Sequence, residues 1–192
     1  LANLALLAAS LLVVVVLAEI ALRFTPYANL LPQRILDSFR PHLRSDPVIG
    51  YDLQKDSPSR PAYIDGRRYD IWTTGLGCFD RPYAGESDPV LLIGDSFTFA
   101  FAPFEDKWGT RMEELLGRRV LKCGVGGYGT RHATLKAAAV LPLLRHPPKL
   151  IVVGYFPNDL EDDYLFPLST VVDGYPVRTR SIKSMDTGEI AV

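Results

Sequence analysis

A short apolar run that ends abruptly in polar residues constrains the fold of this chain most strongly. Residues 90–93 are Val-Leu-Leu-Ile, and Gly94, Asp95 and Ser96 follow at once. A continuous apolar run of this length, closed by a turn signal, predicts a strand that is buried on both faces of a sheet. Because open α/β sheets bind ligands beyond the carboxyl ends of their strands, Ser96 stands where such a fold places its chemistry.

Two further strands and two helices are predicted after this run. Apolar periodicity indicates strands at 119–123 and 150–154, the latter also buried, and helices at about 104–116 and 130–144. Strands that alternate with helices at this spacing favour right-handed crossovers and therefore an α/β domain with a parallel sheet. Three strands are few for such a domain, so the sheet looks truncated. The core-facing side of the second helix is expected to carry Leu135, Ala138, Ala139 and Leu143.

The start of the chain is apolar enough for a membrane. Residues 1–22 contain a single charged residue, Glu19, and their length fits a membrane-spanning helix of about 20 residues. We predict an anchor over 1–23 that contacts the membrane through 1–22. A cleaved signal peptide is the alternative, because the residues that end at Ala18 have the small-residue form of a cleavage site. The arginines after this span favour a cytoplasmic location for that side of it.

Residues 24–86 have a different composition, rich in proline, arginine and aspartate with scattered aromatic residues. So many aromatic side chains do not suit a solvated tether. We therefore predict a membrane-proximal arm over 24–86 that packs on an α/β domain over 87–192.

Composition disfavours several classes of function. The chain has 192 residues and a formal net charge of −1, which gives no electrostatic reason to expect a nucleic-acid partner. Its two cysteines, Cys78 and Cys123, form no disulfide framework and no zinc-binding pattern. A bridge between them is compatible with the sequence, which does not decide it; without a bridge, Cys123 is expected to be a small core residue.

Three strand ends supply polar groups that can converge at one edge of the sheet. They carry Ser96, a glycine-rich loop at 124–129, and Asn158. These groups suit acyl transfer, in which a hydroxyl attacks a carbonyl carbon and the resulting oxyanion needs fixed donors worth about 3 kcal/mol each. The alternative role for Ser96 is to cap a helix, because serine is an ordinary N-cap residue.

Three sequence blocks resemble those of the SGNH, or GDSL, hydrolase superfamily. Gly94-Asp-Ser-Phe-Thr98 looks like the first block, and Gly124-Val-Gly-Gly-Tyr-Gly-Thr130 resembles the second in the form found in membrane-anchored bacterial members. Asn158-Asp159 resembles the third. The resemblance implies a flavodoxin-like three-layer α/β/α fold and a serine esterase or O-acyltransferase. The implied substrate is a carbohydrate or lipid ester outside the cytoplasm, with no metal or organic cofactor.

The resemblance also implies roles for individual residues. Ser96 would be the nucleophile and the first oxyanion donor, and Gly127 and Asn158 would complete the oxyanion hole. Asp95 and Asp159 are expected to support the geometry around Ser96 and Asn158.

One expected element, a C-terminal Asp-x-x-His that supplies the base, does not occur in the sequence. The histidines are His42, His132 and His146. Of these, His132 alone follows a strand end on the correct edge and is a candidate base, although a surface histidine at a helix start is the default for it. We expect the catalytic histidine to lie beyond Val192. The alternative is a non-catalytic, membrane-tethered module that retains the fold.

Two other interpretations stay open. Gly124-x-Gly126-x-x-Gly129 follows a predicted strand and precedes a helix, as in dinucleotide-binding proteins, but the acidic residue expected at the end of the next strand is absent. Carboxylates after the third strand offer oxygen ligands for a divalent cation, although a solvated loop is the usual role of such a run. These carboxylates are Asp159, Glu161, Asp162 and Asp163.

Overall fold

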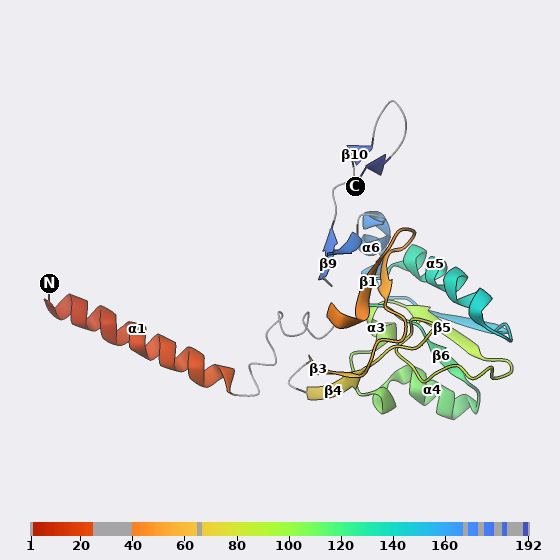
Figure 1. Cartoon of the computed structure of the whole chain (residues 1–192), viewed down its shortest axis with the longest axis horizontal. Coiled ribbons are helices and arrows are strands. Elements are labelled where there is room, and N and C mark those ends of the chain that lie inside the picture. Colours follow the sequence, from red (N-terminus) through yellow and green to blue (C-terminus); the bar gives the residue numbers. More distant parts are fainter. Residues whose placement is uncertain are drawn as a thin grey trace.

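The computed structural model describes residues 2–24, 40–64, 67–166, 169–172, 175–178, 182–183 and 190–191. It begins with helix α1 (Ala2–Arg23), which lies apart from the other described elements (Figure 1). The stretch Asn3–Arg23 reaches a mean hydropathy of 2.7 and buries no residue. Its length and composition suit a membrane-spanning helix, and a signal sequence would have the same properties.

A sheet of three parallel strands forms the centre of the fold, in the order β6-β5-β7. The strands are β5 (Val90–Gly94), β6 (Val120–Lys122) and β7 (Leu150–Gly154). Every residue of β5 is buried, as its apolar sequence predicts. The predicted α/β class with a parallel sheet is therefore confirmed.

Helices cover both faces of this sheet (Figure 1). They are α4 (Trp108–Leu116) and α5 (Thr130–Val140), and the short helix α3 (Ser96–Phe99) follows β5. Alternate residues of β5 point to opposite faces: Leu92 packs with Met112 of α4, and Leu91 packs with Ala137 of α5. The chain thus forms three layers, with the sheet in the middle.

The prediction that β7 is buried is wrong for most of the strand. Leu150, Ile151 and Val153 are 41–47% exposed. The physical reason is position, because β7 pairs with β5 on one side and, within the described residues, no strand pairs with its other edge. An apolar sequence indicates a strand but does not report how many neighbours the strand has.

The arm before the sheet forms two antiparallel hairpins. Their strands are β1 (Leu43–Asp46), β2 (Gly50–Leu53), β3 (Arg60–Ile64) and β4 (Arg67–Ile71). Buried residues of these hairpins, such as Tyr51 and Ile71, share one core with Phe79, Phe99 and Tyr128. Arm and sheet layer are thus packed together, and the domain boundaries predicted near residues 23 and 86 stay predictions.

Short elements end the described chain. Helix α6 (Asp159–Leu165) follows β7. Two antiparallel strand pairs come next, β8 (Ser169–Val172) with β9 (Tyr175–Arg178) and β10 (Ile182–Lys183) with β11 (Ile190–Ala191).

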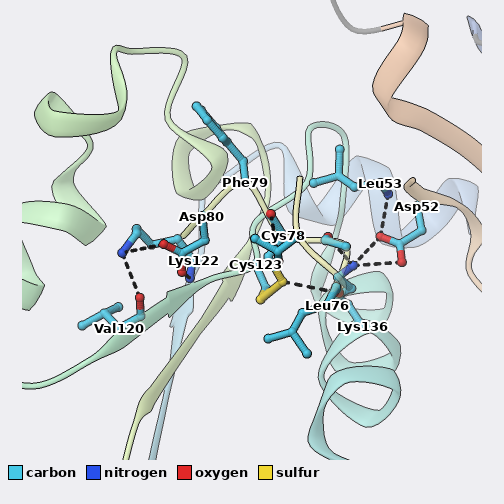
Figure 2. Close-up of a disulfide and its surroundings, with 12 residues drawn as sticks. Asp52, Leu53, Leu76, Cys78, Phe79, Asp80, Val120, Lys122, Cys123 and Lys136 are labelled. Atoms are coloured by element: carbon cyan, nitrogen blue, oxygen red, sulfur yellow. Dashed lines mark hydrogen bonds and ion pairs between the residues drawn. A yellow bond between two sulfur atoms is a disulfide. The ribbon is translucent and has the colours of Figure 1, made fainter. Parts of the chain in front are cut away.

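A disulfide joins Cys78 to Cys123, which are 45 positions apart in the sequence. Figure 2 shows the bridge between two buried lysine sites, Lys136 with Asp52 on one side and Lys122 with Asp80 on the other. Cys123 directly follows β6, so the bridge ties the C-terminal part of the arm to the start of the glycine-rich loop.

The Lys136 ammonium has three acceptors, one for each of its protons. Its Nζ lies 2.6 and 2.9 Å from the two carboxylate oxygens of Asp52 and 2.8 Å from the carbonyl oxygen of Gly77. Burial of such a charge is tolerated only when it is paired and hydrogen-bonded in this way.

Candidate active site

Ser96 occupies the first position of helix α3, directly beyond β5. Asp95 is the N-cap residue, because its Oδ1 accepts a hydrogen bond from the Phe97 backbone nitrogen at 2.9 Å. The Ser96 hydroxyl therefore does not cap the helix. It is half-exposed, and its Oγ lies 3.5 Å from Asp95 Oδ2, at the long limit of a hydrogen bond.

The strand order places Ser96 at a topological switch point. The chain leaves β5 for β6 on one side and later returns to β7 on the other, so the crevice between β5 and β7 is where such sheets bind ligands. Gly94 and Gly154 are paired across these two strands, and a side chain at either would overlap Thr98. The two glycines thus let α3 lie directly on the strand ends.

The glycine-rich loop passes beside Ser96 and is held by the arm. A Cβ atom added to Gly126 would lie 3.9 Å from the Ser96 Cβ. The Tyr51 hydroxyl donates to the Gly126 carbonyl oxygen at 2.7 Å, and the Tyr128 hydroxyl donates to the Tyr51 carbonyl oxygen at 2.7 Å. Gly127 has a φ of +77°, which disfavours any side chain there. Reciprocal tyrosine contacts therefore fix the loop that carries the expected second oxyanion donor.

Tyr51 received no role at the site from sequence reasoning. It precedes Gly126 by 75 positions, and no spacing rule links a tyrosine in one hairpin to a carbonyl in a distant loop. Only the fold reveals this contact.

Two glycines of the dinucleotide-like pattern are occupied by contacts within the protein. A side chain at Gly124 would overlap the backbone of Thr98 and Phe99, and one at Gly129 would overlap Asp159 and Asp163 of α6. Packing of the chain on itself therefore accounts for both glycines, which weakens the dinucleotide-binding interpretation.

Asn158 and Asp159 lie at the start of α6, beyond β7. The Asn158 side chain is exposed and its Nδ2 donates to Asp162 Oδ2 at 2.9 Å, which uses one of its two amide protons. Asp159 is buried, and its Oδ1 has no hydrogen-bond partner among the described residues. Burial and the nearby negative charge of Asp95 raise the pKa of Asp159 to about 6. Asp95 and Asp159 thus interact electrostatically beneath the site.

The default expectation for a histidine at a helix start is a position on the surface. His132 is buried instead. Its Nδ1 accepts a hydrogen bond from the Gly129 backbone nitrogen at 3.2 Å, and its ring stacks on Tyr128 with 5.1 Å between centroids. Phe166 covers the ring edge-on at 4.7 Å. Burial lowers the pKa of His132 to about 4, so the imidazole is neutral at pH 7.

The other two histidines form their hydrogen bonds with groups other than Ser96. His42 is buried in the arm, where its Nδ1 lies 2.8 Å from the Ser57 hydroxyl. The backbone nitrogen of His146 donates to the Tyr83 hydroxyl. Among the described residues, no histidine side chain forms a hydrogen bond with Ser96.

Some of the carboxylates after β7 accept hydrogen bonds from other groups of the protein. Asp163 Oδ1 accepts from the Arg131 backbone nitrogen at 2.8 Å, and Asp162 accepts from Asn158. Glu161 is exposed. In the part of the chain that the structure describes, no group of three or more histidine, cysteine or acidic side chains is arranged to hold a metal ion.

Comparisons with known proteins give a partial structural match. No protein-family model and no curated protein matches this chain. The chain matches a solved SGNH esterase. That structure is the crystal structure of AlinE4, described as an SGNH-hydrolase family esterase. The sequence identity is 26%, the TM-score is 0.36, and the match covers 42% of this chain and 46% of the AlinE4 chain.

Proposed function

We propose that this protein is a membrane-anchored serine esterase or O-acyltransferase that acts on a carbohydrate or lipid ester. The observation that carries the proposal is the position of Ser96 at the β5/β7 switch point, with a hydroxyl that no capping bond occupies. The backbone nitrogens of Ser96 and Gly127 and the second amide proton of Asn158 are the proposed oxyanion donors. Loss of one such donor costs about 3 kcal/mol of barrier.

The reaction has two steps. The Ser96 oxygen attacks the ester carbonyl carbon and loses its proton to a base, and the tetrahedral intermediate then expels the alcohol, which takes up that proton. The acyl-serine next reacts with water, or with a hydroxyl of an acceptor, to regenerate Ser96. The base is a requirement that the described contacts do not meet, because the Ser96 hydroxyl has Asp95 and no histidine as its hydrogen-bond partner among the described residues.

The proposed location is outside the cytoplasm, with residues 1–23 as anchor, 24–86 as arm and 87–192 as catalytic domain. The Cys78–Cys123 disulfide supports this location, because disulfides persist in oxidising compartments and are rare in the cytosol. The apolar α1 supports attachment, and a signal peptide is the alternative role for it.

A serine-directed fluorophosphonate tests the proposal on the full chain in detergent. We expect one labelled peptide, which contains Ser96, and no labelling of Ser96→Ala. Ser10→Ala, with a substitution in α1, is the matched control and should label like the parent protein.

A non-catalytic module with the same fold is the second candidate. It is favoured by one observation, namely that no histidine side chain among the described residues forms a hydrogen bond with Ser96. If Ser96 fails to label while thermal unfolding shows a folded protein, this second function replaces the first.

A further inference from the structure

A hollow of about 270 Å³ lies directly beside the proposed nucleophile. Ser96, Phe97, Ala100 and Phe101 line it. Apart from the Ser96 hydroxyl, every side chain in this lining is apolar, and none is charged. A group that binds here is therefore held by its shape and its apolar surface.

The first wall of the hollow is built by a strained turn. Ala100 follows α3 with a φ of +53° and a ψ of 100°, a sparsely populated backbone conformation that costs a residue other than glycine about 1–3 kcal/mol. The turn brings Phe101 back onto Phe99, with 5.3 Å between ring centroids. A Cβ atom at Gly126 would lie 3.6 Å from Phe101 Cζ and 3.9 Å from Ser96 Cβ, so Phe101 and Ser96 flank the same point of the glycine loop.

The second wall is Phe97, whose ring is supported by an aromatic residue from another strand end. Phe97 of α3 stacks on Phe156, which follows β7, with ring centroids 3.8 Å apart. Phe97 is 56% exposed despite this stack. Its backbone oxygen accepts a hydrogen bond from Trp108 Nε1 at 2.8 Å, which fixes its position. Backbone strain and exposed aromatic side chains are costly, and both are retained where a ligand binds.

We propose that this hollow binds the acyl group of the substrate, and that this group is short and uncharged. The proposal rests on the proposed function, because it takes the hollow as the acyl side of an ester attacked by Ser96. A volume of 270 Å³ corresponds to about nine water molecules, at roughly 30 Å³ each. A methylene group is similar in size to a water molecule and part of the hollow opens to solvent, so a chain of about two to six carbons fits and a long lipid chain does not.

The first test compares the rates at which two p-nitrophenyl alkylphosphonates label Ser96 in the full chain. We expect the butyl compound to react at least about tenfold faster than the dodecyl compound, since each methylene group that the hollow cannot hold lowers the affinity. Phe101→Ala should reduce this ratio about fivefold or more by opening the wall. Phe101→Leu, which keeps apolar bulk, and Leu115→Ala, on the exposed side of α4, should retain it.

The second test measures binding without catalysis. Saturation-transfer NMR of butyrate with Ser96→Ala should show binding that Ser96→Ala/Phe101→Ala loses and Ser96→Ala/Leu115→Ala keeps. Thermal unfolding checks that each variant is folded.

The two tests separate the acyl site from the nucleophile. If Ser96 labels but the butyl-to-dodecyl ratio is the same in Phe101→Ala, the acyl site is refuted and the proposed function stands. If neither phosphonate labels Ser96 but butyrate binding depends on Phe101, the acyl site stands and the nucleophile does not. Absence of both labelling and butyrate binding overturns both proposals.

Discussion

Removal of the Cys78–Cys123 disulfide should destabilise the protein by an amount that its position in the chain predicts. The bridge closes a loop with a sequence separation of 45 residues. In the chain-entropy description, a loop of this length restricts the unfolded state by about 13 cal/mol/K, which is about 4 kcal/mol at 25 °C. The double variant Cys78→Ala/Cys123→Ala should therefore lose about 4 kcal/mol of unfolding free energy.

Thermal unfolding of the full chain in detergent measures this loss. For a folded unit of this size, 1 kcal/mol shifts the melting temperature by roughly 3–5 °C, so the variant should melt roughly 10–20 °C lower. Fluorophosphonate labelling of Ser96 should also slow, because Cys123 directly precedes the glycine loop. Figure 2 shows how the bridge lies between the two buried lysine sites that it helps to hold together.

A reductant provides the matched control. Dithiothreitol should lower the melting temperature of the parent protein toward that of the double variant and leave the double variant unchanged. A shift below about 1 kcal/mol, or an equal effect of reductant on both proteins, would refute the chain-entropy argument.

Three further predictions concern the contacts beneath the site. Tyr51→Phe removes the bond to the glycine loop and should cost about 1 kcal/mol and slow Ser96 labelling, whereas Tyr164→Phe on the surface should do neither; equal labelling in both contradicts this role. Lys136→Met leaves Asp52 buried with weaker partners and should cost about 3 kcal/mol in denaturant unfolding, and adding Asp52→Asn should restore more than half. Strictly additive losses would contradict the pairing. Because the pKa of Asp159 rises from 3.8 to about 6 on folding, the folded state binds more protons between these values and loses stability as pH rises through them. The melting temperature of Asp159→Asn, relative to that of the parent protein, should therefore increase from pH 4 to pH 7. A difference in melting temperature that stays constant over this range would contradict the raised pKa of Asp159.

Sequence reasoning located the sheet and the strand end that carries Ser96 because both depend on local signals. The apolar run of β5 and the glycine at its end identify the strand and its turn, and they place Ser96 at a strand end. The capping role was assigned less well. Asp95 caps α3, and this choice between neighbouring polar residues depends on backbone angles that the sequence does not show.

The structure buries a different face of α5 from the one that the sequence pattern predicts. The structure buries Ala133, Lys136, Ala137 and Val140 and leaves Ala138 and Ala139 exposed. The reason is the ion pair with Asp52, which draws a lysine into the core 84 positions after its partner. A hydrophobic period has no means of predicting that a charged residue faces inward when its counter-ion lies in another segment.

The disulfide and the tyrosine contacts escaped prediction for the same reason. Each joins the arm to groups in or beside the glycine loop, and each depends on how the arm lies on the sheet. The role of His132 was also left open by its sequence context, since its burial comes from Tyr128 and Phe166.

The sharing of one core by the arm and the sheet layer has a consequence for synthesis of the chain. Asp52 leaves the ribosome 84 residues before Lys136, which at about 5–20 residues per second is an interval of about 4–17 s. Throughout that interval Asp52 lacks Lys136 and has Arg44 of the same hairpin as its counter-ion. For nearly as long, Tyr51 lacks Tyr128, against which it packs. Long-range contacts of this kind slow folding, so the nascent arm exposes its apolar side chains for that interval and is a segment that a chaperone would protect.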